Sequence, residues 1–155
     1  MTDTSMNDND LDFITDIREN GLITQNDLVR DALRGVDCVL AFETASDYLG
    51  TNKMSYRPAF YVYSLQELNI PGVECTVVDS YDNMDIVDDG VLRCTSARQT
   101  IIDLLRNDRD PQVTIEAIAD WYFAHGESYE GLNIPEDIQA EFDDYADDAI
   151  HYFDC

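Results

Sequence analysis

The sequence predicts an α+β fold with a small, mostly antiparallel central sheet packed by N-terminal and C-terminal helices. Three observations predict it. Apolar residues recur with helical spacing near both ends of the chain, β-branched and aromatic runs separated by turn residues occupy the middle, and no repeat or linker divides the 155 residues. We expect residues 1–10 to form a disordered or frayed acidic N-terminus. Residues 11–155 are expected to form a single domain, a size at which about 68–70% of the chain's surface is buried on folding.

The N-terminal part of the domain predicts three helices. The first covers the apolar positions of residues 11–17. Thr24, with Asp27 three residues later, resembles a capping box and opens a second helix that stops at Gly35. A third helix is expected directly after it, with one apolar stripe and with Gly50 at its end. The stripe consists of Cys38, Phe42, Ala45 and Leu49.

The middle of the chain predicts short strands. Residues 59–63 and 74–78 have the β-branched and aromatic composition that is typical of strands. The dipeptide Asp89-Gly90 is a tight-turn signal. It predicts a hairpin between residues 86–87 and residues 91–93.

Three more helices are expected after the sheet. Ser96 and Gln99 have capping-box spacing, and Asp110-Pro111 opens a second helix that is apolar nearly all round and therefore central to the core. Pro135 suits the first position of the last helix. The inward face of that last helix is predicted to consist of Ile138, Phe142, Tyr145 and Ala149.

The composition is strongly acidic. The chain has 33 Asp and Glu against 9 Lys and Arg, a formal net charge of −24. A potential this negative repels phosphate and anionic lipid, so we expect neither direct nucleic-acid binding nor membrane binding. No apolar run approaches the roughly 20 residues of a membrane span, and no basic-then-apolar stretch suggests a secretory leader. We therefore expect a cytoplasmic protein.

The cysteines predict buried thiols. None forms a CxxC pair, and all of them except Cys155 lie far in the sequence from both histidines. Because zinc sites need clustered ligands, buried free thiols are favoured over a metal site or a disulfide, which fits a reducing cytoplasm. The cysteines are Cys38, Cys75, Cys94 and Cys155, and the histidines are His125 and His151.

No pattern in the sequence predicts catalysis, a metal or a cofactor. The chain has no GxSxG, Walker, HExxH or GxGxxG motif. The acids between Asp79 and Asp89 fail the EF-hand pattern because Met84 stands where that loop needs Gly, so turn roles are favoured for them. His125 precedes Gly126 near a helix end, where capping is favoured over catalysis. A Cys–His nucleophile pair from distant segments has no local support. We identify no catalytic residue and no metal ligand.

The negative charge is concentrated in the C-terminal part of the chain. Residues 110–155 contain thirteen carboxylates and no Lys or Arg. On the last predicted helix, acids at i, i+4, i+7 and i+11 form a stripe, and each like-charge pair costs roughly a few tenths of a kcal/mol. No basic residue on this helix offsets the penalty. We therefore interpret the stripe as a surface that binds a protein with a basic surface. The stripe consists of Asp137, Glu141, Asp144 and Asp148, with Asp143 and Asp147 beside it.

The acidic charge is also compatible with roles that involve no partner. A solvated helix face accounts for the same stripe, and a salt-adapted proteome would suit a chain with one lysine and 24 Asp. Lys53 and Arg57 form the only basic loop, where contact with an anion and simple loop solubility account for them equally well.

Three segments of the sequence carry a family resemblance. They are DCVLAFETASDYLG (residues 37–50), VDSYDNMDIVDDGVLRCTSARQTIIDLL (residues 78–105) and AIADWYFAHGESYEGLNIP (residues 117–135). Together they resemble the AbiEi-type antitoxins of abortive-infection, type IV toxin–antitoxin systems. The resemblance implies a bacterial cytoplasmic protein paired with a nucleotidyltransferase-type toxin, in which an AbiEi-like α+β domain neutralises the toxin. None of these segments is catalytic.

The sequence departs from that family at its N-terminus and in its charge. Longer members carry a winged helix that represses their own operon, whereas this N-terminus is too short and too acidic for a complete one. A helix-turn-helix can be drawn over residues 12–33. Its second helix offers Gln25, Asn26, Arg30 and Arg34, but Asp27 and Asp31 favour helical packing over DNA reading.

These observations predict a non-enzymatic acidic binding protein that neutralises a nucleotidyltransferase-type toxin by protein–protein contact. The alternative is an acidic decoy from a phage or mobile element. Such a DNA mimic, of the anti-CRISPR type, blocks a basic nucleic-acid-binding defence complex. An autorepressor and an undetected hydrolase rank below both.

Overall fold

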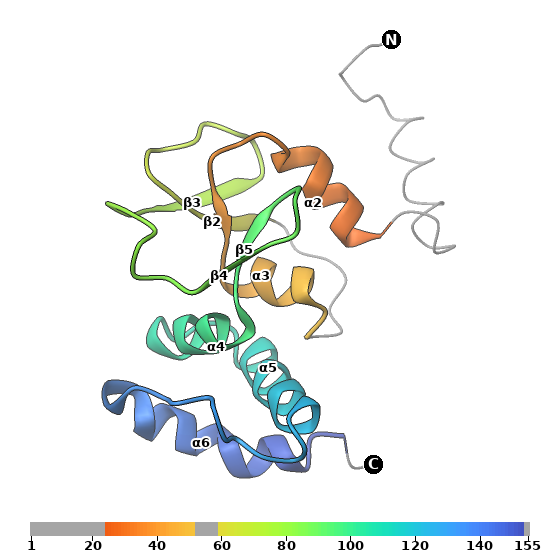
Figure 1. Cartoon of the computed structure of the whole chain (residues 1–155), viewed down its shortest axis with the longest axis vertical. Coiled ribbons are helices and arrows are strands. Elements are labelled where there is room, and N and C mark those ends of the chain that lie inside the picture. Colours follow the sequence, from red (N-terminus) through yellow and green to blue (C-terminus); the bar gives the residue numbers. More distant parts are fainter. Residues whose placement is uncertain (1–23, 52–58, 154–155) are drawn as a thin grey trace.

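The computed structural model describes residues 24–51 and 59–153 (Figure 1). The expected frayed residues 1–10, the expected helix around residues 11–17, Lys53 and Arg57 lie outside the described residues. The elements are α2 (Gln25–Leu33), β1 (Val39–Leu40), α3 (Phe42–Leu49), β2 (Phe60–Ser64), β3 (Val73–Val77), β4 (Ile86–Asp88), β5 (Arg93–Thr95), α4 (Ala97–Arg106), α5 (Pro111–Ala124), the 3₁₀ turn η1 (Glu136–Ile138) and α6 (Gln139–Ile150). Helices around a five-stranded sheet confirm the predicted α+β class.

The sheet is mixed, not purely antiparallel. Its strand order is β3-β2-β1-β5-β4. The β1–β2 and β4–β5 pairs are antiparallel, and the second of these is the hairpin expected at Asp89-Gly90. The β2–β3 and β1–β5 pairs are parallel.

The central strand β1 was not predicted. Val39 and Leu40 fall where the third helix was expected to begin, but α3 starts only at Phe42. Both residues of β1 are fully buried, one on each face of the sheet. A strand buried on both faces has no apolar–polar alternation, so its sequence resembles the start of a buried helix.

Local capping signals set the helix starts as predicted. The Thr24 hydroxyl accepts a hydrogen bond from the Asp27 backbone N–H at 3.2 Å, and the Asp27 carboxylate accepts one from the Thr24 N–H at 3.0 Å. Ser96 caps α4, and Asp110 caps α5 with Pro111 at its first position. These capping residues fix where the chain enters each helix.

The core lies on both faces of the sheet. On one face, α2 and the middle of α3 pack against the sheet in a cluster that includes Val29, Leu33, Leu40, Ala45 and Val62. On the other face, α4, α5 and α6 form a second cluster, which includes Val39, Tyr63, Ile101, Ile118 and Phe142. Neighbouring strand residues belong to opposite clusters because successive side chains of a strand point to opposite faces.

The helices α4, α5 and α6 lie together on one side of the sheet, with α6 farthest from it (Figure 1). As expected, α5 is central and packs against both α4 and α6. Its last turn differs from the expectation, since Trp121 and Tyr122 are half-buried and Phe123 is 40% exposed. None of the described helices is long and apolar enough to cross a membrane.

Candidate protein-binding site

The arginines of the described residues mostly bind groups of the same chain. Arg106 donates two hydrogen bonds to the Asp137 carboxylate, at 3.0 and 2.8 Å. Other ion pairs join Arg93 to Asp37 at 2.7 Å and Arg30 to Asp89 at 3.2 Å, and Arg98 donates to the carbonyls of residues 132 and 133. These positive charges are therefore offset within the fold.

The Arg109 side chain is less exposed than those of Arg30, Arg93 and Arg106. Its guanidinium donates to the Glu43 carboxylate, with Nη2 2.7 Å from Oε1, and the backbone N–H of Asp110 donates to Oε2 at 3.2 Å. Burial raises the pKa of Glu43, but the hydrogen bonds from Arg109 and from the backbone outweigh it and hold that pKa below its ordinary value. Glu43 is therefore held as a carboxylate, and it offsets the charge of Arg109 within the protein.

Three of the four predicted stripe residues lie on the solvent side of α6. Phe142 and Ala149 are buried against the core, whereas Glu141, Asp144 and Asp148 are exposed. Within the described residues, no Lys, Arg or His side chain forms an ion pair with any of these three acids. No described cation therefore offsets the charge of this part of the stripe.

Asp137 differs from the rest of the predicted stripe. It lies in η1, before α6 begins, and the Arg106 side chain of α4 binds it. That hydrogen bond lowers the pKa of Asp137 below its ordinary value. The sequence pattern placed all four acids on one helix and did not reveal this pair, because its partners are far apart in the chain.

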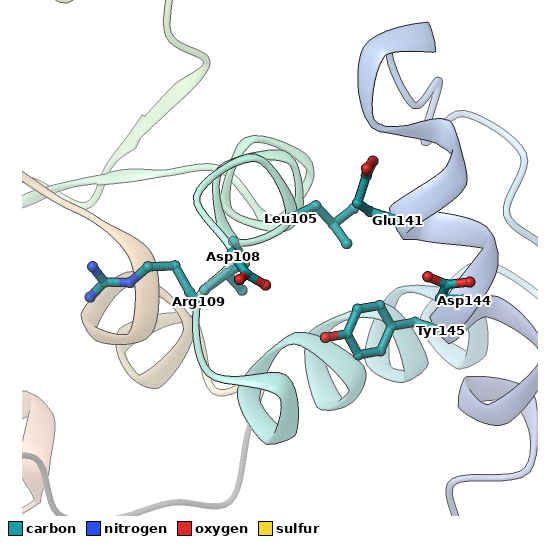
Figure 2. Close-up of a pocket in the computed structure, with 7 residues that line it drawn as sticks. Leu105, Asp108, Arg109, Glu141, Asp144 and Tyr145 are labelled. Carbon is teal, nitrogen blue, oxygen red and sulfur yellow. The ribbon is translucent and has the colours of Figure 1, made fainter.

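A pocket lies between the end of α4 and α6 (Figure 2). Its volume is about 150 Å³. It is lined by Leu104, Leu105, Asp108, Arg109, Glu141, Asp144 and Tyr145. The guanidinium of Arg109 points away from α6 and out of the pocket (Figure 2). The charged groups that remain at the pocket are three carboxylates.

The negative charge around the pocket affects its tyrosine, Tyr145. Burial raises the pKa of Tyr145 above its ordinary value, and the charges of Asp108, Asp144 and Asp110 raise it further. Sequence reasoning identified Glu141 and Asp144 but missed Asp108. The residue follows α4 in a left-handed backbone conformation, with φ of 50°, which Asp adopts more readily than most residues. No helical periodicity marks such a position.

The other residues singled out in the sequence have structural roles. Cys38 and Cys94 are buried free thiols, as predicted, and burial raises their pKa to about 11 and about 12. His125 is the C-cap of α5, also as predicted, and its ring stacks on Trp121 at 3.8 Å. Asp89 accepts hydrogen bonds from the backbone of Val91 and Leu92 in the predicted turn.

Within the part of the chain that the structure describes, no group of three His, Cys, Asp or Glu residues could hold a metal ion. Cys75 is a half-buried free thiol on β3, and Cys155 lies outside the described residues.

No protein-family model and no curated protein matches the chain. The resemblance to AbiEi-type antitoxins therefore depends on the three sequence segments alone.

Proposed function

We propose that this protein is a non-enzymatic, cytoplasmic binding protein that neutralises a partner with a basic surface by protein–protein contact. The proposed action is that of an antitoxin that neutralises a nucleotidyltransferase-type toxin. One observation supports the proposal most directly. Several arginines pair with acids of the same chain, whereas Glu141, Asp144 and Asp148 are exposed on α6 and form no such pair with any residue that the structure describes.

The physical consequence of this arrangement is electrostatic attraction of a basic partner. A surface of one sign raises the rate at which an oppositely charged partner finds it, and added salt screens the attraction. The proposed contact residues are Glu141, Asp144 and Asp148 of α6, with Asp137 of η1 just before this helix. Because Arg106 already offsets the charge of Asp137, we expect Asp137 to contribute less than the other three.

The test is growth rescue in cells that express a nucleotidyltransferase-type toxin encoded beside this gene. The wild-type protein is expected to restore growth, and the double variant Asp144→Lys/Asp148→Lys is expected to lose rescue. The matched control is Asp79→Lys/Asp82→Lys, which makes the same change in net charge at exposed positions between β3 and β4. Absence of rescue by the wild type, or equal loss in both variants, counts against the proposed site.

An acidic decoy is the second candidate, and the charge density of α6 favours it. The helix has twelve residues, which span about 18 Å. It contains five acids, so it carries one charge per roughly 3.6 Å, close to the roughly 3.4 Å spacing of charges along one DNA strand. A decoy is expected to displace nucleic acid from its partner. An antitoxin that binds elsewhere on a toxin is expected to restore growth without such displacement.

A further inference from the structure

The pocket between α4 and α6 has the size of one side-chain head group. A cavity of about 150 Å³ takes a group about as large as benzene. A guanidinium with its last methylene groups is of that size, whereas a nucleotide is much larger. The occupant that the pocket suits is therefore part of one residue.

The charge of the pocket selects a cation. Asp108, Glu141 and Asp144 lie around it, and no described residue forms an ion pair with them. The guanidinium of Arg109 is turned away to Glu43. The C-terminal end of α4 also lies at the pocket, and the negative end of a helix dipole favours a cation.

The apolar lining selects among cations. Leu104 and Leu105 offer a surface for methylene groups, and the Tyr145 side chain projects from α6 toward the end of α4 (Figure 2). Arginine combines an apolar stem with a planar guanidinium that stacks on aromatic rings and donates five N–H groups in a fixed geometry. Lysine carries a compact, strongly hydrated charge. It interacts less well than arginine with an aromatic ring and with carboxylates that lie apart from one another.

We propose that this pocket binds an arginine side chain of the partner protein. The inference rests on the proposed function and adds to it the identity of the residue that the acidic face recognises. Asp108, Glu141 and Asp144 accept the guanidinium hydrogen bonds, and the leucines with Tyr145 contact the stem. The partner is thus a protein that presents an exposed arginine within its basic surface.

The test is an NMR titration of the full-length protein with the peptide acetyl-Gly-Arg-Gly-amide at low salt. The amide signals of Leu104, Leu105 and Tyr145 are expected to shift. Asp144→Asn is expected to weaken the peptide affinity about tenfold, as the loss of a hydrogen bond to a charged group does. Asp147→Asn is the matched control, because it removes the same charge from the same helix outside the pocket. It is expected to change the affinity less than about twofold.

Several outcomes overturn the proposal. They are an equal loss in Asp144→Asn and Asp147→Asn, shifts confined to other residues, equal affinity for acetyl-Gly-Lys-Gly-amide, and no binding of the arginine peptide. These outcomes leave the acidic binding face intact, because growth rescue tests that face separately. A wild-type protein that binds the peptide in the pocket but rescues no growth instead contradicts the proposed function alone.

Discussion

Arg109 and Glu43 form an ion pair that joins the α4–α5 connection to α3. Arg109 Nη2 lies 2.7 Å from Glu43 Oε1, and the two side chains are 28% and 8% exposed. The guanidinium lies over the rings of Phe42 and Tyr61, at 4.5 and 4.6 Å from their centres. This pair holds the guanidinium of Arg109, a residue that lines the acidic pocket, away from the pocket (Figure 2).

We expect Arg109→Met to lower the free energy of unfolding by about 3 kcal/mol. The substitution leaves the carboxylate of Glu43 buried without its partner, which is the costly way to break a buried ion pair. Urea unfolding of the variant and the wild type measures the difference. The double variant Glu43→Leu/Arg109→Met is the control and is expected to lose less than Arg109→Met alone. If the double variant is the less stable of the two, the unpaired carboxylate is not the cause.

The pair between Arg106 and Asp137 predicts how binding depends on individual acids. Removing the pair together, in Arg106→Gln/Asp137→Asn, leaves the net charge of the face unchanged. The affinity for a fluorescent decalysine peptide at low salt is therefore expected to change less than about twofold. Asp144→Asn/Asp148→Asn removes two uncompensated charges and is expected to weaken binding about tenfold. Fluorescence anisotropy measures both, and a comparable loss in the two variants means that Asp137 contacts the peptide directly.

Local chemistry made much of the fold predictable. Thr24 with Asp27, Ser96, and Asp110 with Pro111 act within one turn of chain, so their patterns identified the starts of α2, α4 and α5. The turn at Asp89-Gly90 is equally local. The parallel pairing of Leu40 with Cys94 joins segments that are distant in the sequence, and no local pattern predicts it.

The candidate site was predictable only in part, for the same reason. Helical periodicity placed Glu141, Asp144 and Asp148 on one exposed face of α6. The pocket exists because the end of α4 packs near that face and brings Asp108 to it. The partner of Asp137 is likewise 31 residues away in the chain. Contacts of this kind follow from tertiary packing rather than from spacing.

Ser96→Ala is expected to lower the free energy of unfolding by about 1 kcal/mol. The Ser96 hydroxyl accepts a hydrogen bond from the Gln99 backbone N–H at 3.1 Å, and alanine leaves this N–H without its cap. The midpoint of urea unfolding measures the loss. Ser96→Thr keeps a capping hydroxyl and serves as the control, with a loss of less than half that of alanine. Equal losses for the two substitutions mean that packing at Ser96, not capping, stabilises α4.

Asp103 predicts a stability change with pH of a definite sign. The residue lies in α4 with 6% of its surface exposed, and Oδ1 accepts a hydrogen bond from Gln99 Nε2 at 3.0 Å. Burial raises the pKa of Asp103 above its ordinary value of 3.8, against the opposing effects of Gln99, Tyr63 and Arg106. Between the unfolded and the folded pKa, the folded protein binds more protons than the unfolded chain. The contribution of Asp103 to stability therefore falls as the pH rises through this window.

The variant Asp103→Asn isolates this contribution, because asparagine keeps the oxygen that accepts from Gln99 and cannot ionise. Well below pH 3.8 Asp103 is protonated in both states, so the difference in melting temperature between variant and wild type is expected to be constant there. As the pH rises toward 7, the wild type is expected to lose stability relative to the variant. Glu136→Gln, an exposed position, is the control and is expected to show no such trend. A difference that stays constant from pH 3 to 7 shows that the charge on Asp103 costs the folded protein nothing.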